Sequence, residues 1–195
     1  MKSILLATTL AAATSTAAFA EPVKYMLDSS HSQVVFSYDH LGFSTTYGMF
    51  SGFEGEIMFD QESPANSSVT VSMPVMSMFT GWEQRDAHFV SGDFFGASEG
   101  DMITFISTSI EVTGDDTALI TGDLTMNDIT QSVVLDATLN GTGTHPMANK
   151  AWAGFDATTT LKRSDFGVGA FAPVVSDEVE VMISLEAAIA DSEES

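Results

Sequence analysis

The sequence predicts an all-β protein with eight antiparallel strands and one short helix across one end. Eight segments alternate between apolar and polar residues with period two, and clusters of Gly, Pro, Asn and Asp separate them. One further interval repeats its residues at helical spacing. The chain has no Cys, so its core and not disulfide bonds must hold it together. Eight such strands fit either a closed barrel or a sandwich.

The predicted strands follow one another at short intervals. They cover residues 32–40, 47–60, 67–73, 102–112, 118–126, 132–140, 152–162 and 179–187. In the first strand Val34, Phe36 and Tyr38 share one face, and polar residues occupy the other. In the second, Gly52 and Gly55 indicate a bulge or sharp bend of the kind that closes a barrel.

The interval 80–95 departs from strand alternation. Four of its residues recur at helical spacing: Trp82, Arg85, Asp86 and Phe89. We expect one short helix here, with Thr80 as its cap. Residues 141–151 and 167–176 are expected to form longer loops.

Residues 1–20 have the features of a secretory signal peptide. They combine a positive start at Lys2, an apolar run and the small-x-small cleavage pattern Ala18-Phe19-Ala20. We expect cleavage, an exported protein with one domain over residues 21–190, and a frayed acidic tail at 191–195. An uncleaved anchor is the alternative. No later stretch is apolar over enough residues to predict a transmembrane helix.

The chain is strongly acidic. It has 27 acidic and 6 basic residues, a formal net charge of −21, and loss of Lys2 would make it −22. Charge of this sign argues against nucleic acid and against anionic lipid surfaces as partners. Solubility is a simpler explanation than a specific cationic partner. The remaining cations are Lys24, Arg85, Lys150, Lys162 and Arg163.

Sequence motifs give little support for catalysis or metal binding. No two His form a close helical pair and there is no Cys, so no metal site is expected. Asp28-Ser-Ser-His31 permits a Ser-His-Asp arrangement, but a nucleophile elbow, a phosphate loop and a dinucleotide fingerprint are missing. Hydrogen bonding of Asp28, Ser32 and His40 where strands meet at a barrel rim is the more economical interpretation. We therefore expect no enzyme, no catalytic residue and no cofactor.

Several short motifs, in order, resemble those of the YceI-like family of lipocalin-like polyisoprenoid-binding proteins. The resemblance spans residues 25–187. The motifs are Asp28-Ser-Ser-His-Ser32, Val34, Phe36, His40-Leu-Gly42, Gly48-Met-Phe50, Phe53-Glu-Gly55, Phe59-Asp60, Thr80-Gly-Trp-Glu-Gln-Arg-Asp-Ala-His-Phe89, Asp93-Phe-Phe95, Ile103-Thr-Phe105, Ser107-Thr108, Gly122-Asp-Leu-Thr125 and Lys162-Arg-Ser-Asp-Phe-Gly167. The chain departs from the family at Asn127-Asp128, where His-Gly is common. That departure puts in question a head-group role for this turn and leaves the apolar lining untouched.

This resemblance implies a lipocalin-like barrel whose interior holds a long isoprenoid or similar lipid, in the periplasm and often as a homodimer. Composition alone favours an ordinary filled core, although Phe and Met suit a pocket for a flexible apolar ligand. The resemblance reverses that preference and turns the apolar faces into a tunnel lining. The expected lining is Phe36, Phe50, Phe53, Phe59, Met73, Met76, Phe79, Trp82, Phe89, Phe94, Phe105, Phe155 and Phe166.

Three cationic or titratable residues are candidates for contact with a lipid head group: Arg85, His88 and Arg163. The structural alternative is that each Arg pairs with a nearby carboxylate, locks the helix or caps a strand end. Few cations and a negative surface favour a neutral head, as in a prenylated quinone or its precursor, over a polyprenyl phosphate. The sequence thus predicts binding or transport of an isoprenoid lipid. The alternatives are a periplasmic esterase or isomerase and an interaction protein with a filled interior.

Overall fold

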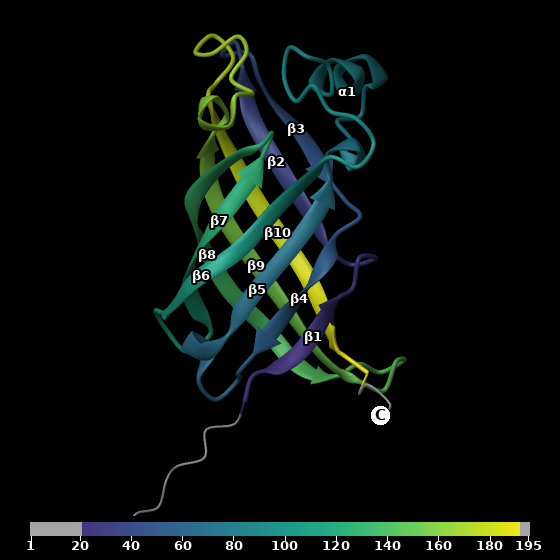
Figure 1. Cartoon of the computed structure of the whole chain (residues 1–195), viewed down its shortest axis with the longest axis vertical. Coiled ribbons are helices and arrows are strands. Elements are labelled where there is room, and N and C mark those ends of the chain that lie inside the picture. Colours follow the sequence, from purple (N-terminus) through teal and green to yellow (C-terminus); the bar gives the residue numbers. More distant parts are fainter. Residues whose placement is uncertain (1–20, 192–195) are drawn as a thin grey trace, which may run out of the picture.

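Antiparallel strands close into a tall barrel in the computed structural model, which describes residues 21–191 (Figure 1). The expected signal peptide and residues 192–195 of the expected tail lie outside the described residues. The strands are β1 (Val23–Leu27), β2 (Gln33–His40), β3 (Ser44–Phe50), β4 (Glu54–Phe59), β5 (Ser68–Pro74), β6 (Met102–Val112), β7 (Thr117–Met126), β8 (Ile129–Thr144), β9 (Ala151–Lys162) and β10 (Glu178–Ile189). The helical segments are η1 (Pro64–Asn66), η2 (Val75–Ser77), α1 (Glu83–Phe89) and η3 (Arg163–Phe166).

The ten strands occupy eight positions around the barrel. β10 pairs with β1 near its C-terminal end and with β2 nearer its N-terminal end, so β1 and β2 are two halves of one interrupted strand. Their partners β4 and β3 are likewise two halves of another. The predicted eight-stranded antiparallel barrel is therefore confirmed. Two details differ: the prediction missed β1, and its second strand breaks between β3 and β4.

An Asp side chain explains the first interruption, and glycines explain the second. In the first, the Asp28 carboxylate accepts a hydrogen bond from the backbone N–H of Ser30 at 3.0 Å, while the Asp28 N–H continues the ladder to the Glu186 carbonyl at 2.8 Å. In the second, Gly52 lies within the break with φ 69°, and Gly55 follows at the start of β4 with φ 156°, where a Cβ would lie 2.2 Å from the Thr70 carbonyl oxygen. Only Gly fits that approach, as the predicted bend requires.

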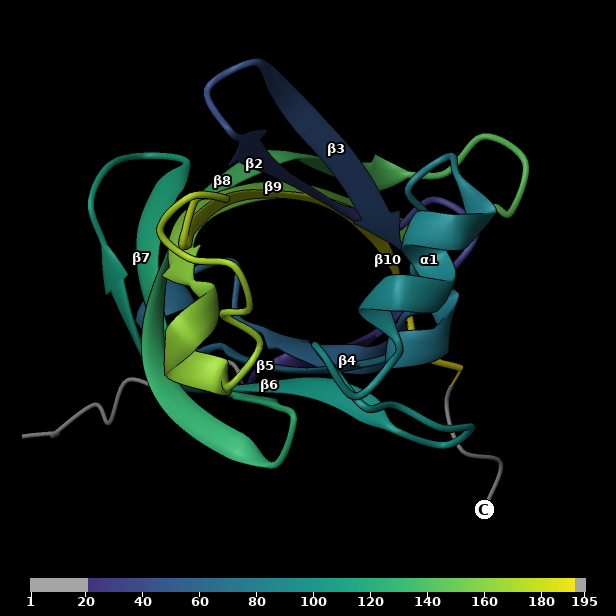
Figure 2. The ribbon, with the colours of Figure 1, turned by 90° about the horizontal axis from the view of Figure 1, so that it is seen from above.

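The short helix α1 lies at one end of the barrel, beside its mouth (Figure 2). It begins after Trp82, so the predicted Thr80 cap is wrong. Thr80 lies too far before the helix to cap it. Its N–H and hydroxyl instead bond to the side chain of Asp86, the N–H at 2.8 Å, which ties the start of the segment to the helix.

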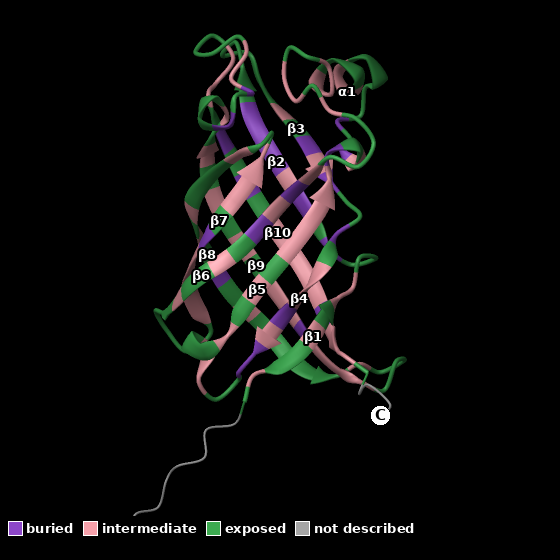
Figure 3. Cartoon of the chain, viewed as in Figure 1, coloured by how far each residue is buried: buried purple, intermediate pink, exposed green. Residues whose placement is uncertain are grey.

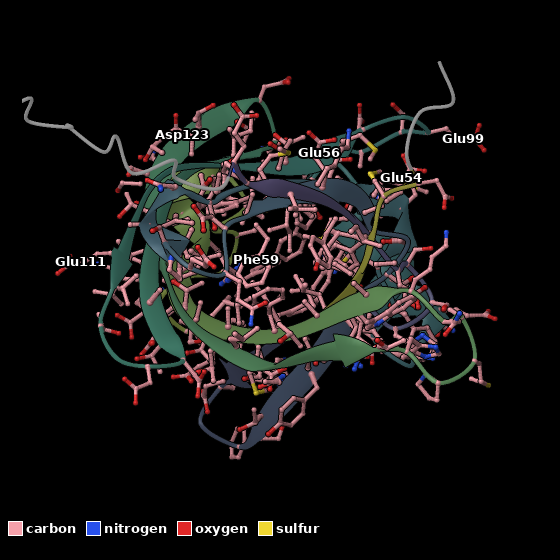
Figure 4. The ribbon with its side chains drawn as sticks, turned by 90° about the horizontal axis from the view of Figure 1, so that it is seen from below. Glu54, Glu56, Phe59, Glu99, Glu111 and Asp123 are labelled. Atoms are coloured by element: carbon pink, nitrogen blue, oxygen red, sulfur yellow. The ribbon has the colours of Figure 1, made fainter. Side chains whose placement is uncertain are left out.

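Inward and outward residues alternate along the barrel wall. Figure 3 shows buried residues interleaved with half-buried and exposed ones along the strands, and mostly exposed loops at the ends. Viewed from below in Figure 4, Phe59 points into the barrel while Glu111 and Asp123 point away from it. These two acidic side chains therefore lie on the outside of the wall. No helix among residues 21–191 is long and apolar enough to cross a membrane.

Candidate functional site

The barrel encloses a cavity of about 1240 Å³. This exceeds the roughly 300–1,000 Å³ of most small-molecule pockets. Inward-facing aliphatic side chains of β8 and β10 form much of one wall: Val133, Leu135, Ala137, Leu139, Val179, Val181, Ile183 and Leu185. Aromatic residues of β2, β3, β4, β6 and β9 line the cavity together with further aliphatic residues of β4, β5 and β6. The interior is therefore an open apolar tunnel and not a filled core.

Eleven of the thirteen predicted lining residues line this cavity, and Met76 and Phe79 do not. These two predictions are wrong, because both side chains are exposed on the outside. The neighbouring Val75 and Met78 are buried in their place. The turn η2 and the bridge between Phe79 and Met49 determine which of these side chains are buried and which are exposed. Composition could not reveal this.

The aliphatic half of the lining was missed because the prediction selected Phe, Met and Trp. A signal for it was present: Val133, Leu135, Ala137 and Leu139 alternate with polar residues along β8. Period two identifies such a face, but it does not show that the face meets an empty lumen.

Two glycines let aromatic rings lie against the barrel wall. Gly48 is the cross-strand partner of Phe36, and a Cβ at Gly48 would lie 2.2 Å from the tip of the Phe36 ring. A Cβ at Gly122 would lie 2.4 Å from the tip of the Phe105 ring. Each ring thus covers a glycine across the strands and does not project into the lumen. This arrangement keeps the tunnel wide.

Aromatic side chains surround the end of the cavity beside α1. The Phe89 ring packs between those of Tyr38 and Phe94, with centroid distances of 6.1 and 5.0 Å. Phe94 in turn lies 6.0 Å from Phe171 in the loop before β10. His88 contacts the edge of this group at 5.1 Å from Phe94. The mouth is therefore apolar and aromatic.

Arg163 acts as a clamp on the loop that follows η3. Its guanidinium makes five hydrogen bonds, at 2.8 to 3.2 Å, with the carbonyls of Val168, Ala170, Val175 and Ser176. All five N–H donors of an arginine are thus engaged within the protein. Burial lowers the pKa of Arg163 from its usual value. This geometry supports the structural alternative for Arg163 over contact with a lipid head group. Its partners are carbonyls, however, and not a carboxylate.

Arg85 and His88 also line the cavity. Arg85 donates to the hydroxyl of Thr80 at 2.9 Å and to its carbonyl at 2.6 Å, and it lies over the Trp82 ring at 5.9 Å. His88 bonds to Asp93 at 3.0 Å. Arg85 therefore locks the start of α1 as the structural alternative expected, again through Thr80 and not through a carboxylate.

The cluster around Asp28 lies on the outside of the barrel and does not form a catalytic triad. Nδ1 of His31 contacts both Asp28 Oδ2, at 2.7 Å, and Ser30 Oγ, at 3.1 Å. In a triad, the hydroxyl and the carboxylate bind opposite nitrogens of the ring. The hydrogen bond from His31 lowers the pKa of Asp28 to about 2, and the same bond raises the pKa of His31.

This cluster also contains ligand atoms that are close enough for a metal ion. Single atoms of Asp28, His31 and Glu186 lie within 4.8 Å of one another. Each is already engaged, since Glu186 accepts a hydrogen bond from the indole of Trp152 at 2.7 Å. The backbone carbonyl of Asp28 and the hydroxyl of Ser32 also bond, at 2.7 Å. Asp28 and Ser32 thus join strands as expected, at the β1–β2 break and not at the rim.

Comparison with known proteins identifies the family. Residues 25–187 match the model of the YceI-like domain. The chain belongs to the YceI-like family. Protein YceI of Escherichia coli O17:K52:H18 is 39% identical over 188 residues, which cover 95% of this chain and 97% of that protein. A UPF0312 protein of Ectopseudomonas mendocina is 41% identical over 164 residues, 83% of this chain and 85% of that protein.

Two solved structures share the barrel. BcnA of Burkholderia cenocepacia superposes with a TM-score of 0.74 at 26% identity, over 82% of this chain and 98% of that one. A polyisoprenoid binding domain from Saccharophagus degradans gives a TM-score of 0.65 over 86% of this chain and 99% of that one. At 14% identity, the second likeness shows the fold alone.

Proposed function

We propose that this protein binds a long-chain isoprenoid lipid inside its barrel and carries it in the periplasm. The observation that carries the proposal is the open apolar cavity, which aromatic and aliphatic side chains line together. The name of the Saccharophagus degradans domain, which has the same fold, supports an isoprenoid as the cargo. We further propose that residues 1–20 are cleaved on export and that two copies can associate as a homodimer.

Binding is driven by removal of hydrocarbon from water. Each buried CH₂ contributes about 0.8 kcal/mol, so several isoprene units gain well over about 10 kcal/mol before the costs of association and ordering. The lipid tail lies along the barrel axis, because the cavity extends from the mouth beside Trp82 and Phe171 to the β6–β7 turn at Asp115 and Asp116. The lining is apolar throughout its middle, which suits a hydrocarbon chain.

A neutral head group, as in a prenylated quinone or its precursor, fits the mouth better than a phosphate. Free N–H donors on cations give the strongest hydrogen bonds to a phosphate. Arg163 has none left, and Arg85 uses two of its own on Thr80. Lys24 pairs with Glu56, and Lys150 pairs with Asp191. The fifth cation, Lys162, borders the cavity and acts electrostatically on the Asp177 carboxylate. The acidic outer surface adds to the disadvantage of an anionic head.

The carrier role is preferred to that of an esterase or isomerase. The Ser30, His31 and Asp28 side chains lie outside the cavity, and their geometry is not that of a triad. Separate replacement of His31, His40 and His88 by Ala distinguishes the two roles. A carrier keeps its bound lipid in all three variants, whereas an enzyme loses turnover in at least one.

The direct test is extraction of the purified protein with organic solvent, followed by mass spectrometry of the extract. We expect about one isoprenoid per chain, and native mass spectrometry should show the same adduct on the intact protein. Recovery of no lipid would overturn the cargo proposal. Recovery of phosphorylated prenyl lipids alone would overturn the preference for a neutral head.

A cavity-filling variant makes this test specific. Ala137 faces the lumen and is buried, so Ala137→Phe adds an aromatic ring inside the tunnel. We expect the extracted lipid to fall several-fold, because overpacking removes the space that the tail occupies. Val134→Phe, on the same strand but exposed outside, is the matched control and should retain the lipid. Equal lipid in both variants would contradict binding inside the barrel.

A further inference from the structure

Four large apolar side chains are exposed together at the end of the barrel where the cavity opens. Leu41 and Phe43 belong to the β2–β3 turn and are 42% and 88% exposed. Phe171 and Val174 belong to the loop before β10 and are 60% and 67% exposed. We call these four residues the apolar tip. Exposed apolar side chains gathered at one place mark an interaction site more often than scattered ones do.

Hydrogen bonds join the two loops of the apolar tip. The backbone N–H of Asp39 donates to Ser176 Oγ at 3.1 Å, and the N–H of Ser176 donates to the Asp39 carbonyl at 3.0 Å. His40 and Val175 form an isolated β-bridge beside them. Figure 1 shows the β2–β3 turn and the loop before β10 at the same end of the barrel. The tip is therefore one surface built from two distant segments.

The apolar tip is continuous with the cavity. Leu41, Phe171 and Val174 also line the tunnel mouth. The Phe171 ring lies 6.0 Å from Phe94 and 6.1 Å from His88, which connects the tip to the aromatic group around the mouth. A lipid that leaves the tunnel at this end passes directly over the tip.

Charge separates the tip from the rest of the molecule. The chain has 27 acidic residues, yet residues 40–44 and 167–176 contain no Asp or Glu. The flanking carboxylates of Asp39 and Asp177 accept hydrogen bonds from the backbone N–H of Gly42, at 2.7 Å, and of Ser164, at 2.9 Å. Acidic side chains would keep a loop in water, whereas uncharged apolar loops can enter the interface of a bilayer. The body of the protein would be repelled by anionic lipids. The tip therefore suits a bilayer surface without net charge.

Two exposed apolar residues of the tip have a backbone conformation that is costly for bulky side chains. Leu41 and Gly42 have φ of 61° and 73° at the centre of the β2–β3 turn, a left-handed conformation that favours Gly, Asn or Asp over Leu. Phe171 also has a positive φ, of 65°. Bulky residues in this conformation are costly, and these two are substantially exposed. A role outside the fold explains why apolar residues occupy these positions.

We propose that the apolar tip inserts into the interface of a net-neutral phospholipid bilayer and places the tunnel mouth against the membrane for lipid transfer. This proposal rests on the proposed lipid cargo, because the tip matters only if a lipid passes over it. A bilayer is favoured over a protein partner because the tip is small, uncharged and aligned with the mouth of an apolar tunnel.

Vesicle binding tests the proposal. The protein is purified as cells produce it, its N-terminus is determined by mass spectrometry, and it is sedimented with phosphatidylcholine vesicles. We expect the double variant F43S/F171S to bind about tenfold more weakly than the unaltered protein, because two aromatic anchors are lost. Met147 is the matched control: it is 88% exposed, as Phe43 is, but it precedes β9 at the opposite end of the barrel. Met147→Ser should bind vesicles normally.

A second variant separates membrane binding from folding. Leu41→Asn suits the hairpin turn, so we expect a higher melting temperature together with weaker vesicle binding. Phosphatidylglycerol vesicles at low salt should bind the protein less well than phosphatidylcholine vesicles do, because the chain carries a charge of −21.

Four results would overturn the proposal: unchanged binding in F43S/F171S, an equal loss in M147S, stronger binding to phosphatidylglycerol, or no binding of the unaltered protein. A dimer in sedimentation velocity that F43S/F171S dissociates would assign the tip to a second copy instead. Lipid extraction is measured on the same samples. Bound lipid without vesicle binding leaves the cargo proposal intact and rejects the docking surface, whereas missing lipid rejects the cargo proposal itself.

Discussion

At the scale of single residues, several polar side chains of this barrel use their hydrogen bonds to hold the backbone in place. Arg163 and Arg85 donate mainly to carbonyls, and Asp28 organises the break between β1 and β2. Asn127, in the turn that departs from the family pattern, donates to the Phe166 carbonyl at 3.1 Å. Buried carbonyls outside a ladder need such donors. The apolar residues are thereby left to line the tunnel.

The Asp28–His31 pair predicts a pH dependence of stability. The lowered pKa of Asp28 gives stability that is present above pH 3.8 and is lost as the pH falls toward 2. The raised pKa of His31 gives stability that is present below pH 6.5 and is lost as the pH rises through its folded value. The contribution of the pair is therefore greatest between pH 3.8 and 6.5.

Asp28→Asn should remove this dependence. We expect NMR titration to show the pKa of His31 returning toward 6.5 in the variant, and urea unfolding to show a loss of stability that is largest inside that pH window. His88→Gln, at the other end of the barrel, is the control. An unchanged His31 titration in Asp28→Asn would show that the pair does not couple in solution.

At the scale of elements, the loop between η3 and β10 depends on a single side chain. Arg163 binds carbonyls on both sides of this loop, and η3 ends at Gly167 with φ 73°. The loop also carries Phe171 and Val174 of the apolar tip. The clamp therefore connects the barrel wall to the surface proposed to dock on membranes.

Arg163→Lys should loosen this loop while keeping the charge. One ammonium group has three donors and cannot replace the five of a guanidinium, so we expect a loss of about 2 kcal/mol in the free energy of unfolding. Amide hydrogen exchange across residues 167–176 should accelerate. Lys162→Gln, which removes a neighbouring exposed cation, should change neither quantity. Equal exchange in Arg163→Lys and the unaltered protein would contradict the clamp.

At the scale of the whole molecule, the width of the tunnel depends on rings that lie flat against the wall. Phe36 covers Gly48, and Phe105 covers Gly122. An eight-stranded barrel is just wide enough either to be filled by its side chains or to hold a small ligand. The orientation of a few large rings thus helps to decide between a core and a cavity.

Gly48→Ala tests this point. The new Cβ would meet the tip of the Phe36 ring at 2.2 Å, and the ring can escape by swinging into the lumen. We expect less bound lipid, or lipid with a shorter tail, in the extract measured by mass spectrometry. Gly154→Ala is the matched control, because its Cβ would find only an ordinary contact at 3.9 Å. The same lipid profile in both variants would show that Phe36 does not limit the tunnel.

The sequence by itself determined the strand pattern and the place of the helix. Alternation in residues 32–40 and 132–140 marked one face of each strand, and Gly52 and Gly55 marked the bend, because these signals are local to the backbone. The lining was predicted from the Phe, Met and Trp residues together with the family resemblance. That choice failed at Met76 and Phe79, which lie in and just after the turn η2 and are exposed.

Only the tertiary structure decided what the faces enclose. Period two shows which residues share a face, but the radius of the closed barrel and the direction of each ring decide whether that face is filled or open. The meeting of the Leu41 turn with the loop of Phe171 also depends on a contact between residues more than a hundred positions apart, Asp39 and Ser176. That contact exists only once the barrel has closed. Composition carries no information on the radius of the barrel or the direction of its rings, which is why composition alone favoured a filled core.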